Sequence, residues 1–387
     1  MTRLTMADVA KAAGISTALV SIVMRGVPGA SDATRARVLR IADELGYVPD
    51  ERARKLRQSR SRVLGVAFEL QQPFHGDLVE RLYAAAAAHG YDIALSAVAP
   101  TRDEPTAVEA LLRERCEAVV LLGSRFTDDG LAALAARVPT LLVARRTLAS
   151  GVGVVRGDDL VGIGLAVDHL VGLGHRSIAH VDGADAPGSA DRRLGFDAAM
   201  ARHGLGRLAD VLTGGLTEAA GARAMTALLA RPAPPSAVIA FNDRCATGVV
   251  DTLVHRGRRV PGDVSVVGYD DSRLAEAPHV QMTTVSQDAT ALAGAAVAKA
   301  LALAGGAEPT ETVLTPRLVI RSTTASPHFP DGESRISPSR NAHLAVMRTA
   351  TRPQPGSTQT PRSTIARICG AITCSRYSLC VNGARSA

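Results

Sequence analysis

The hydrophobic and polar residues of the first 46 positions repeat with helical spacing in three short segments. Each segment opens on a hydroxyl residue suited to cap a helix and closes on a glycine, which readily ends one. These start and stop residues are Thr5 and Gly14, Ser16 and Gly26, and Ser31 and Gly46, with Asp8 completing a capping-box pattern at the first. The tight turn between the first two segments predicts a helix-turn-helix arrangement.

The second segment does not keep its apolar residues to one face. Val20, Val23 and Met24 share one stripe, whereas Ile22 lies on the opposite stripe. The members of that opposite stripe are Thr17, Ala18, Ser21, Ile22 and Arg25. A stripe that faces solvent is ordinarily polar, so the position of Ile22 indicates that this face contacts something other than water.

Residues 49–62 form a short basic segment after the third helix. Pro49 and Asp50 suit the start of a further helix, which a polar linker follows. Leu56 stands alone between basic neighbours. Such a leucine can act as an apolar wedge between base pairs in the minor groove of DNA. The fragment by itself is equally consistent with Leu56 docking on the core of the protein.

From Val63 onward the pattern changes to short apolar runs separated by amphipathic segments. The expected strands occupy residues 62–70, 91–98, 117–124, 140–146, 151–155, 177–183, 210–215, 236–243 and 264–271. The expected helices include residues 77–89, 158–172, 191–203, 217–230 and 244–256. Near-continuous apolar strands separated by helices are typical of parallel sheets covered on both faces. We therefore expect an α/β fold with two stacked subdomains in this part of the chain.

These patterns divide the chain into four expected parts. They are a helix-turn-helix head (1–48), a hinge helix and linker (49–62), a two-subdomain core (63–326) and a tail (327–387). The tail is rich in Ser, Arg, Pro and Thr and has no sustained period, which predicts disorder.

The net charge of +7 is unevenly distributed. Residues 1–62 carry +6 and the tail carries another +6, whereas the core carries −5. A basic head on an acidic core indicates that the head binds a polyanion. A merely solvated basic face would have the same composition.

Composition and motifs exclude several classes of protein. Five scattered cysteines do not fit a disulfide framework, and they agree with a reducing cytoplasm. The chain has neither a run of eighteen apolar residues nor an apolar signal core, so we expect a cytoplasmic, nucleoid-associated protein without a membrane span. Serine-hydrolase, P-loop and zinc-ligand motifs are lacking, so we expect no enzyme, no cofactor and no metal.

The order of these elements resembles the LacI/GalR (lactose-repressor) family of bacterial transcription regulators over roughly residues 3–325. The segments similar to the DNA-binding head and hinge of that family are residues 5–26 and 31–61. The segments similar to its ligand-binding core are residues 73–95, 169–183, 241–248, 260–271 and 282–288. The resemblance implies a repressor that binds a near-palindromic double-stranded DNA operator as a homodimer.

The resemblance also implies which residues contact DNA, with the second helix in the major groove. They are Thr5, Ser16, Thr17, Ala18, Ser21, Ile22, Arg25, Ala53, Arg54, Leu56 and Arg57. The family's hinge leucine matches Leu56, which favours the wedge interpretation. The family usually has Arg at the position of Ile22 and Asn at that of Arg25. We therefore expect a different half-site, with Ile22 contacting a thymine methyl group.

For the core, the resemblance implies a likeness to periplasmic sugar-binding proteins, with a small carbohydrate effector in the cleft between two subdomains. The implied effector ligands are Phe74, His75, Arg192, Asn242 and Asp270. Amide and carboxylate groups bond vicinal hydroxyls, Arg supplies a charged fork, and Phe offers a flat apolar wall. Arg193 is an alternative to Arg192, and His75 is equally compatible with a place at the rim. Leu216 replaces an aromatic residue of many relatives, so no particular effector is carried over.

Three other functions fit parts of the sequence. A sugar-uptake protein would share the core but would need a signal peptide. An enzyme could use the same scaffold, because fold does not determine function. A DNA-binding regulator with a degenerate core would lack an effector, and the leucine at position 216 leaves room for that alternative.

Overall fold

The computed structural model describes residues 4–24, 26–47 and 61–328 of the 387-residue chain. The predicted head helices are present as α1 (Met6–Ala13), α2 (Thr17–Met24) and α3 (Asp32–Leu45). Their apolar stripes meet in a small core that includes the fully buried Val9, Val20 and Val38. Three short helices bury enough apolar surface for such a core only by packing against one another.

The predicted caps of the head helices are confirmed. The backbone N–H of Thr5 donates to Oδ2 of Asp8 at 2.8 Å, which forms the capping box of α1. The hydroxyl oxygens of Ser16 and Ser31 each accept a backbone N–H in the first turn of α2 and α3. No single described helix is long and apolar enough to span a membrane. The pair α1–α2 meets that criterion only jointly, with a bend of 107°.

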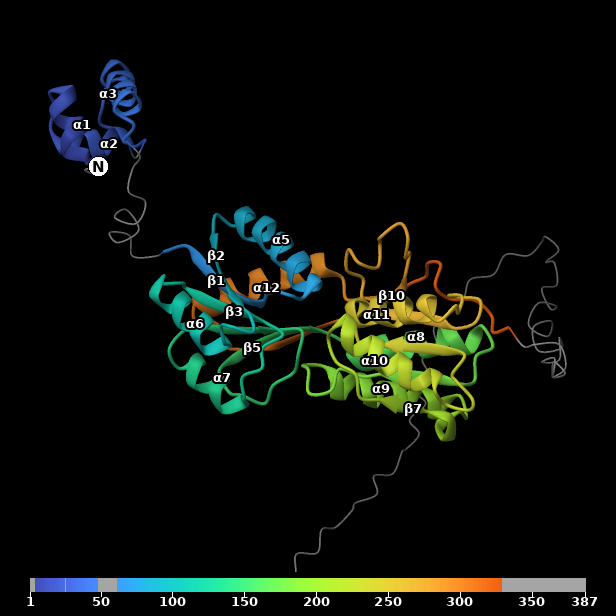
Figure 1. Ribbon diagram of the computed structural model, residues 1–387. Helices are drawn as coiled ribbons and strands as arrows, with labels where there is room; N and C mark the ends of the chain where they lie inside the picture. The colour runs from blue at the N-terminus through green and yellow to red at the C-terminus, as the bar shows by residue number, and fades with distance from the viewer. Residues whose placement is uncertain (1–3, 25, 48–60, 329–387) are drawn as a thin grey trace, which may run out of the picture. The chain divides into compact units, whose positions relative to one another are not determined.

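The first core subdomain has a six-stranded parallel sheet with the strand order β11-β5-β4-β3-β1-β2. Its strands are β1 (Val63–Glu69), β2 (Asp92–Val98), β3 (Ala118–Leu122), β4 (Thr140–Val143), β5 (Val152–Gly157) and β11 (Glu311–Leu314). Helices α5 (Pro73–Ala88) and α12 (Ala289–Ala304) pack on one face, and α6 (Glu104–Arg113) and α7 (Asp128–Ala135) on the other. Figure 1 shows α5 and α12 side by side although they are far apart in sequence.

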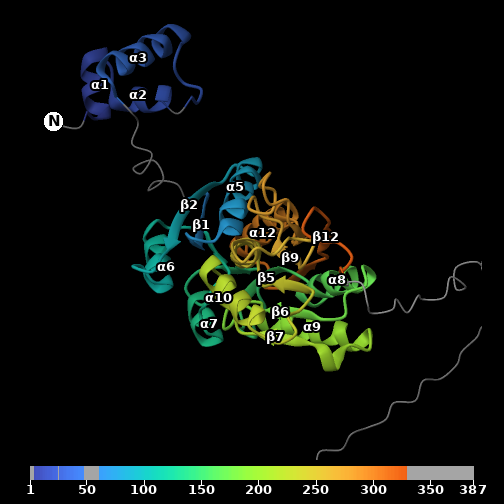
Figure 2. The same cartoon turned by 45° about the vertical axis from the view of Figure 1, so that its right-hand side comes forward.

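The second subdomain has a six-stranded sheet with the order β12-β10-β9-β8-β6-β7, in which only β12 runs antiparallel. Its strands are β6 (Ile178–Val181), β7 (Asp210–Leu212), β8 (Ala237–Ala240), β9 (Ser265–Asp270), β10 (Thr283–Ser286) and β12 (Arg317–Val319). Helices α8 (Asp159–Gly172) and α9 (Ser189–Arg202) cover one face, and α10 (Glu218–Leu229) and α11 (Asp243–His255) the other. Figure 2 shows α8 and α9 as neighbours.

The chain crosses between the two subdomains after β5, after β10 and after β11. These crossings place α12 and β11 in the first subdomain although they follow most of the second in sequence. A two-subdomain α/β core with parallel sheets, as the sequence predicts, is therefore confirmed. Ligands of such sheets bind outside the carboxyl ends of the strands, where the connecting loops of both subdomains can meet.

Candidate functional site

A cavity lies at the carboxyl ends of the strands and is lined by residues from both subdomains. The empty space between its lining residues, counted together with the open mouth, is about 480 Å³. All five residues that the family resemblance implied as effector ligands line this cavity. They are Phe74, His75, Arg192, Asn242 and Asp270.

Arg192, on α9, is buried, and its guanidinium is held from several sides. Its Nε donates to Oδ1 of Asp159 at 2.9 Å, and its Nη1 donates to the carbonyl of Phe241. The guanidinium also lies 4.5 Å from the ring centre of Phe241 and 3.5 Å from that of Tyr269. Its Nη2 is 4.0 Å from Oδ1 of Asp270. The position of this cation is therefore fixed before any ligand arrives.

The neighbouring Arg193 has a different environment. Its guanidinium pairs with the buried Asp182, and its side chain is 46% exposed. Arg193 is not among the cavity-lining residues, whereas Arg192 is. The geometry thus favours Arg192 over Arg193 as the cavity arginine.

Asp270 ends β9 in a conformation that L-residues rarely adopt, with φ of 110°, and Asp271 follows with φ of 55°. Backbone strain of this kind is characteristic of functional sites. Oδ1 of Asp270 accepts a hydrogen bond from Nε2 of Gln287 at 2.8 Å. Burial raises the pKa of Asp270 above its ordinary value, the nearby Asp243 raises it further, and Arg192 opposes both.

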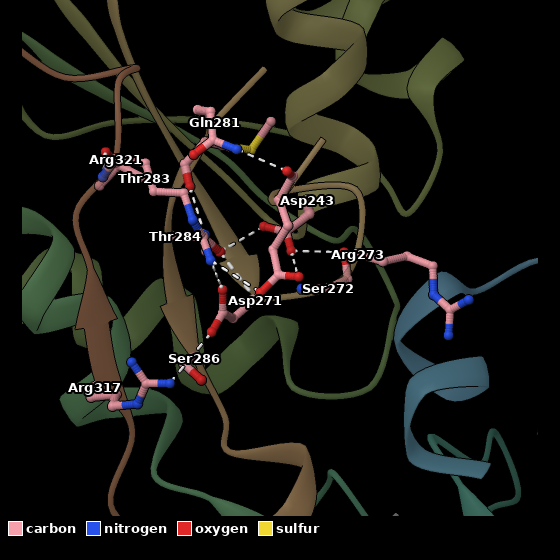
Figure 3. A network of polar contacts seen from close by, with 12 residues as sticks. Asp243, Asp271, Ser272, Arg273, Gln281, Thr283, Thr284, Ser286, Arg317 and Arg321 are labelled. Atoms are coloured by element: carbon pink, nitrogen blue, oxygen red, sulfur yellow. Dashed lines mark hydrogen bonds and ion pairs between the residues drawn. The ribbon is translucent and has the colours of Figure 1, made fainter. Parts of the chain in front are cut away.

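A network of polar contacts holds the loop that begins with Asp271, directly after β9, as Figure 3 shows. Asp271 accepts from Nη2 of Arg321 at 2.7 Å. Asp243, at the start of α11, accepts from the backbone N–H of Ser272 at 2.7 Å and from the hydroxyl of Thr284 at 2.6 Å. Because Asp243 is fully buried, its pKa is also raised. These contacts join β9, β10 and α11 around the strained turn.

One side chain leaves this network toward the other subdomain. In Figure 3 Arg273 extends away from Asp243 toward α5. There its Nε donates to Oδ1 of Asp77 at 2.7 Å, and its Nη2 lies 3.3 Å from Oε2 of Glu80. Nη1 of Arg244 likewise donates to the carbonyl of Gln71 at 2.9 Å. The loop after β9 is thus bonded to both subdomains.

His75 is buried in the cavity wall. Its Nδ1 accepts the backbone N–H of Glu69 at 3.0 Å. Burial lowers the pKa of His75 to about 4, so the ring is neutral at pH 7. The sequence left open whether His75 stands in the cavity or at its rim. A side chain only 9% exposed that also lines the cavity agrees with the first alternative.

Sequence reasoning missed Glu69, Gln72 and Gln287, which also line the cavity. Gln72 is only 7% exposed, and its Oε1 accepts from Nδ2 of Asn242 across the two subdomains at 3.4 Å. A signal was present in the sequence. Glu69 lies near the end of the first predicted strand and Gln72 two residues beyond it, and the carboxyl end of a parallel strand is where ligands bind.

The predicted DNA-contacting residues on α2 differ in how far they are exposed to solvent. Thr17 and Ala18 are exposed on α2, whereas Ser21 and Ile22 are half-buried. A Cβ added to Gly29 would lie 3.4 Å from Cγ2 of Ile22, so this isoleucine covers part of the loop between α2 and α3. The contact with Gly29 gives Ile22 a packing role in addition to any contact with DNA.

The remaining proposed DNA contacts divide into two groups. Thr5 and Ser16 cap the first two helices. Outside the described residues lie Arg25, Ala53, Arg54, Leu56 and Arg57. Over the ranges 4–24, 26–47 and 61–328, no group of three or more His, Cys, Asp or Glu side chains is arranged to hold a metal ion.

Comparison with known proteins gives matches over the helix-turn-helix head and over much of the core. Residues 5–50 match the family model "Bacterial regulatory proteins, lacI family", and residues 167–324 match "Periplasmic binding protein-like domain". The HTH-type transcriptional regulator GalR of Salmonella typhimurium is 33% identical over 331 residues, which cover 84% of this chain and 96% of GalR.

Two crystal structures are similar in fold. A LacI transcriptional regulator from a Rhodococcus species is 66% identical with a TM-score of 0.68, over 68% of this chain and 98% of that one. The lac repressor dimer bound to operator and the anti-inducer ONPF is 28% identical with a TM-score of 0.74, over 84% of this chain and 100% of that one.

Proposed function

Because this chain belongs to the lacI family of bacterial regulatory proteins, we propose that it is a DNA-binding transcription repressor controlled by a small sugar-like effector. One observation carries the proposal. The five effector ligands that the resemblance implied line a single cavity between the subdomains, in a chain that also has a helix-turn-helix head. Neither part alone would support regulation by a ligand.

The head reads the operator with the outer face of α2 in the major groove. In this proposal Thr17, Ser21 and Ile22 meet base edges, with Ile22 on a thymine methyl group. Arg25 reaches guanine or phosphate, and Leu56 inserts at the central base step. Two such heads on a two-fold axis bind two half-sites, so the protein acts as a homodimer on a near-palindromic operator.

The cavity controls the head through the arrangement of the two subdomains. An effector that contacts Arg192 and Asp270 on one side and Phe74 and His75 on the other favours one relative arrangement of the sheets. Because coupling of this kind is reciprocal, the operator changes effector affinity by the same factor as the effector changes operator affinity.

We assign the cavity to binding and not to catalysis. The neutral His75 accepts a backbone N–H through Nδ1, and Arg192 is held by Asp159. Neither group is paired with a serine, threonine or cysteine nucleophile among the hydrogen bonds of the described residues. The relatives named above are regulators, which favours the same assignment.

Selection of bound duplexes from a random DNA pool by the purified full chain tests the proposed function. We expect enrichment of a near-palindromic sequence with a fixed central step. A folded protein that enriches no sequence, with or without added sugars, would contradict it.

A further inference from the structure

We propose that the effector is a polyhydroxylated molecule without phosphate or carboxylate, bound through hydrogen bonds to Glu69, Gln72 and Asp270. The inference rests on the proposed function, because it names the class of molecule that the same cavity accepts. It is carried by the charge balance of the cavity, by one buried donor without a partner and by two aromatic walls.

The cavity has no free positive charge for an anion. Arg192 is the one cation among the described residues that line it, and His75 is neutral at pH 7. Asp159 accepts a hydrogen bond from Nε of Arg192 at 2.9 Å, and the Phe241 carbonyl accepts one from Nη1. Nη2 lies 4.0 Å from Oδ1 of Asp270. A phosphate or carboxylate binds tightly to Arg when the guanidinium fork is free, whereas two of the three nitrogens of this guanidinium, Nε and Nη1, already donate to the protein.

The N-termini of two helices at the cavity, α5 and α11, are also unsuited to an anion. The N-terminus of a helix attracts anions through its unpaired backbone N–H groups. Helix α5 begins with Pro73, which has no N–H, and the first turn of α11 is capped by Oδ1 of Asn242, which accepts from the backbone of Cys245 at 2.8 Å. Asp243 adds a carboxylate at the first position of α11.

Carboxylates are instead in excess. Within the described part of the chain, the half-buried Glu69 carboxylate has neither a hydrogen bond nor an ion pair, although its backbone N–H bonds His75. Asp270 accepts one hydrogen bond, from Gln287 at 2.8 Å. The oxygens of a carboxyl group accept hydrogen bonds, so those of Glu69 and Asp270 suit the hydroxyl groups of a polyol.

Gln72 supplies the complementary donor. Its side chain is more than nine-tenths buried and lines the cavity, and its Nε2 has no hydrogen-bond partner among the described residues. An unsatisfied buried N–H is costly, and a ligand oxygen in the cavity would satisfy it. Oε1 of the same amide is turned toward Nδ2 of Asn242 at 3.4 Å, which leaves Nε2 for the ligand.

The walls suit a ring with an apolar face. Phe74 and Phe241 both line the cavity and are 5% and 3% exposed. Aromatic rings pack against the C–H face of a sugar while the polar groups around them bond its hydroxyls. This combination favours a sugar over a flexible amine or a short organic acid.

A matched panel tests the proposal on the full chain by thermal unfolding. The probes are glucose, galactose, mannose, xylose, arabinose, ribose, cellobiose and maltose, each monosaccharide beside its terminal phosphate or its uronic acid. We expect one or more uncharged sugars to raise Tm by several degrees when saturating. The charged form of the same sugar should bind roughly 100-fold more weakly or worse.

Two variants and a control sharpen the test. Gln72→Ala should weaken the binding of that sugar about tenfold, whereas the neighbouring exposed Gln71→Ala should leave it unchanged. Glu69→Gln should narrow the difference in affinity between the uncharged sugar and its phosphate. Tighter binding of a phosphate or uronate, or no binding of any uncharged sugar by a chain that still selects an operator, would overturn the inference alone. Failure to select an operator would instead contradict the proposed function.

Discussion

Charge placement within the cavity illustrates how single residues determine its chemistry. Arg192 enters a fully buried setting only because Asp159 balances its charge and two aromatic rings flank it. The five ligands came from the resemblance to a family, since an isolated Asn or Asp after a strand is more often a turn residue. The position of Gln72 and Glu69 at the end of the first predicted strand was a signal in the sequence. Which of their polar atoms lack a partner is a property of the packed structure, and the sequence could not show it.

At the same scale, Ile22→Arg should change which half-site the head prefers. The substitution replaces an apolar group on α2 with a charged fork that bonds guanine. Selection from random DNA measures the preference directly. Leu39→Arg adds the same charge on the exposed surface of α3, and it should alter affinity without altering the preferred sequence. An unchanged preference in Ile22→Arg would show that this side chain does not read bases.

At the scale of elements, the pattern of apolar residues explains which strands and helices the sequence predicted and which ones it missed. The predicted strands were long apolar runs, and each contains or overlaps an observed strand. Strands β10, β11 and β12 have only three or four residues each, and two of them are partly exposed, so no apolar run marked them. Helix α12 is apolar on nearly every side, so periodicity could not reveal it.

The packing of α10 against α11 gives a prediction for Gly248. A Cβ at this position would lie 1.9 Å from the carbonyl oxygen of Glu218, which is backbone and cannot give way cheaply. Gly248→Ala should therefore lower the free energy of unfolding by about 2–3 kcal/mol or more, as measured by urea denaturation. Gly294→Ala on α12 is the matched control, because its Cβ would meet nothing within 4 Å. That change should raise stability by about 0.5–1 kcal/mol through helix propensity alone. Equal effects of the two substitutions would contradict this packing.

At the scale of the whole molecule, three chain crossings and the Arg273–Asp77 contact join two subdomains that share one cavity. A change in their arrangement must therefore involve the loops that hold the ligand. The sequence predicted the two-subdomain architecture because its strand and helix periods are strong. It could not predict the contacts between subdomains, since Asp77 and Arg273 are separated by nearly two hundred positions.

Buried histidine makes the stability of the whole molecule depend on pH. Burial lowers the pKa of His180 to about 4, from 6.5. The unfolded chain thus binds more protons between those values, and the stability contributed by His180 is complete above pH 6.5 and is lost below it. Lowering the pH from 7.5 to 5.5 should reduce the free energy of unfolding by about 1 kcal/mol through His180. Asp243 and Asp270, whose pKa values are raised, act in the opposite direction.

The comparison of variants isolates this contribution. Urea denaturation at pH 7.5 and at pH 5.5 measures the free energy of unfolding. On acidification His180→Gln should lose about 1 kcal/mol less of it than the wild type loses. The exposed His89→Gln should behave as the wild type does. Identical pH responses of His180→Gln and the wild type would exclude a buried neutral His180.

The coupling between cavity and head is the central claim, and one titration tests it most directly. The affinity of the full chain for its selected operator is measured by fluorescence anisotropy, with and without a sugar that raises Tm. We predict that the sugar changes the operator Kd by about 5- to 150-fold in the wild type, and that Asp270→Asn removes this response while operator binding remains. A sugar that binds the cavity yet leaves the operator Kd unchanged would contradict the account.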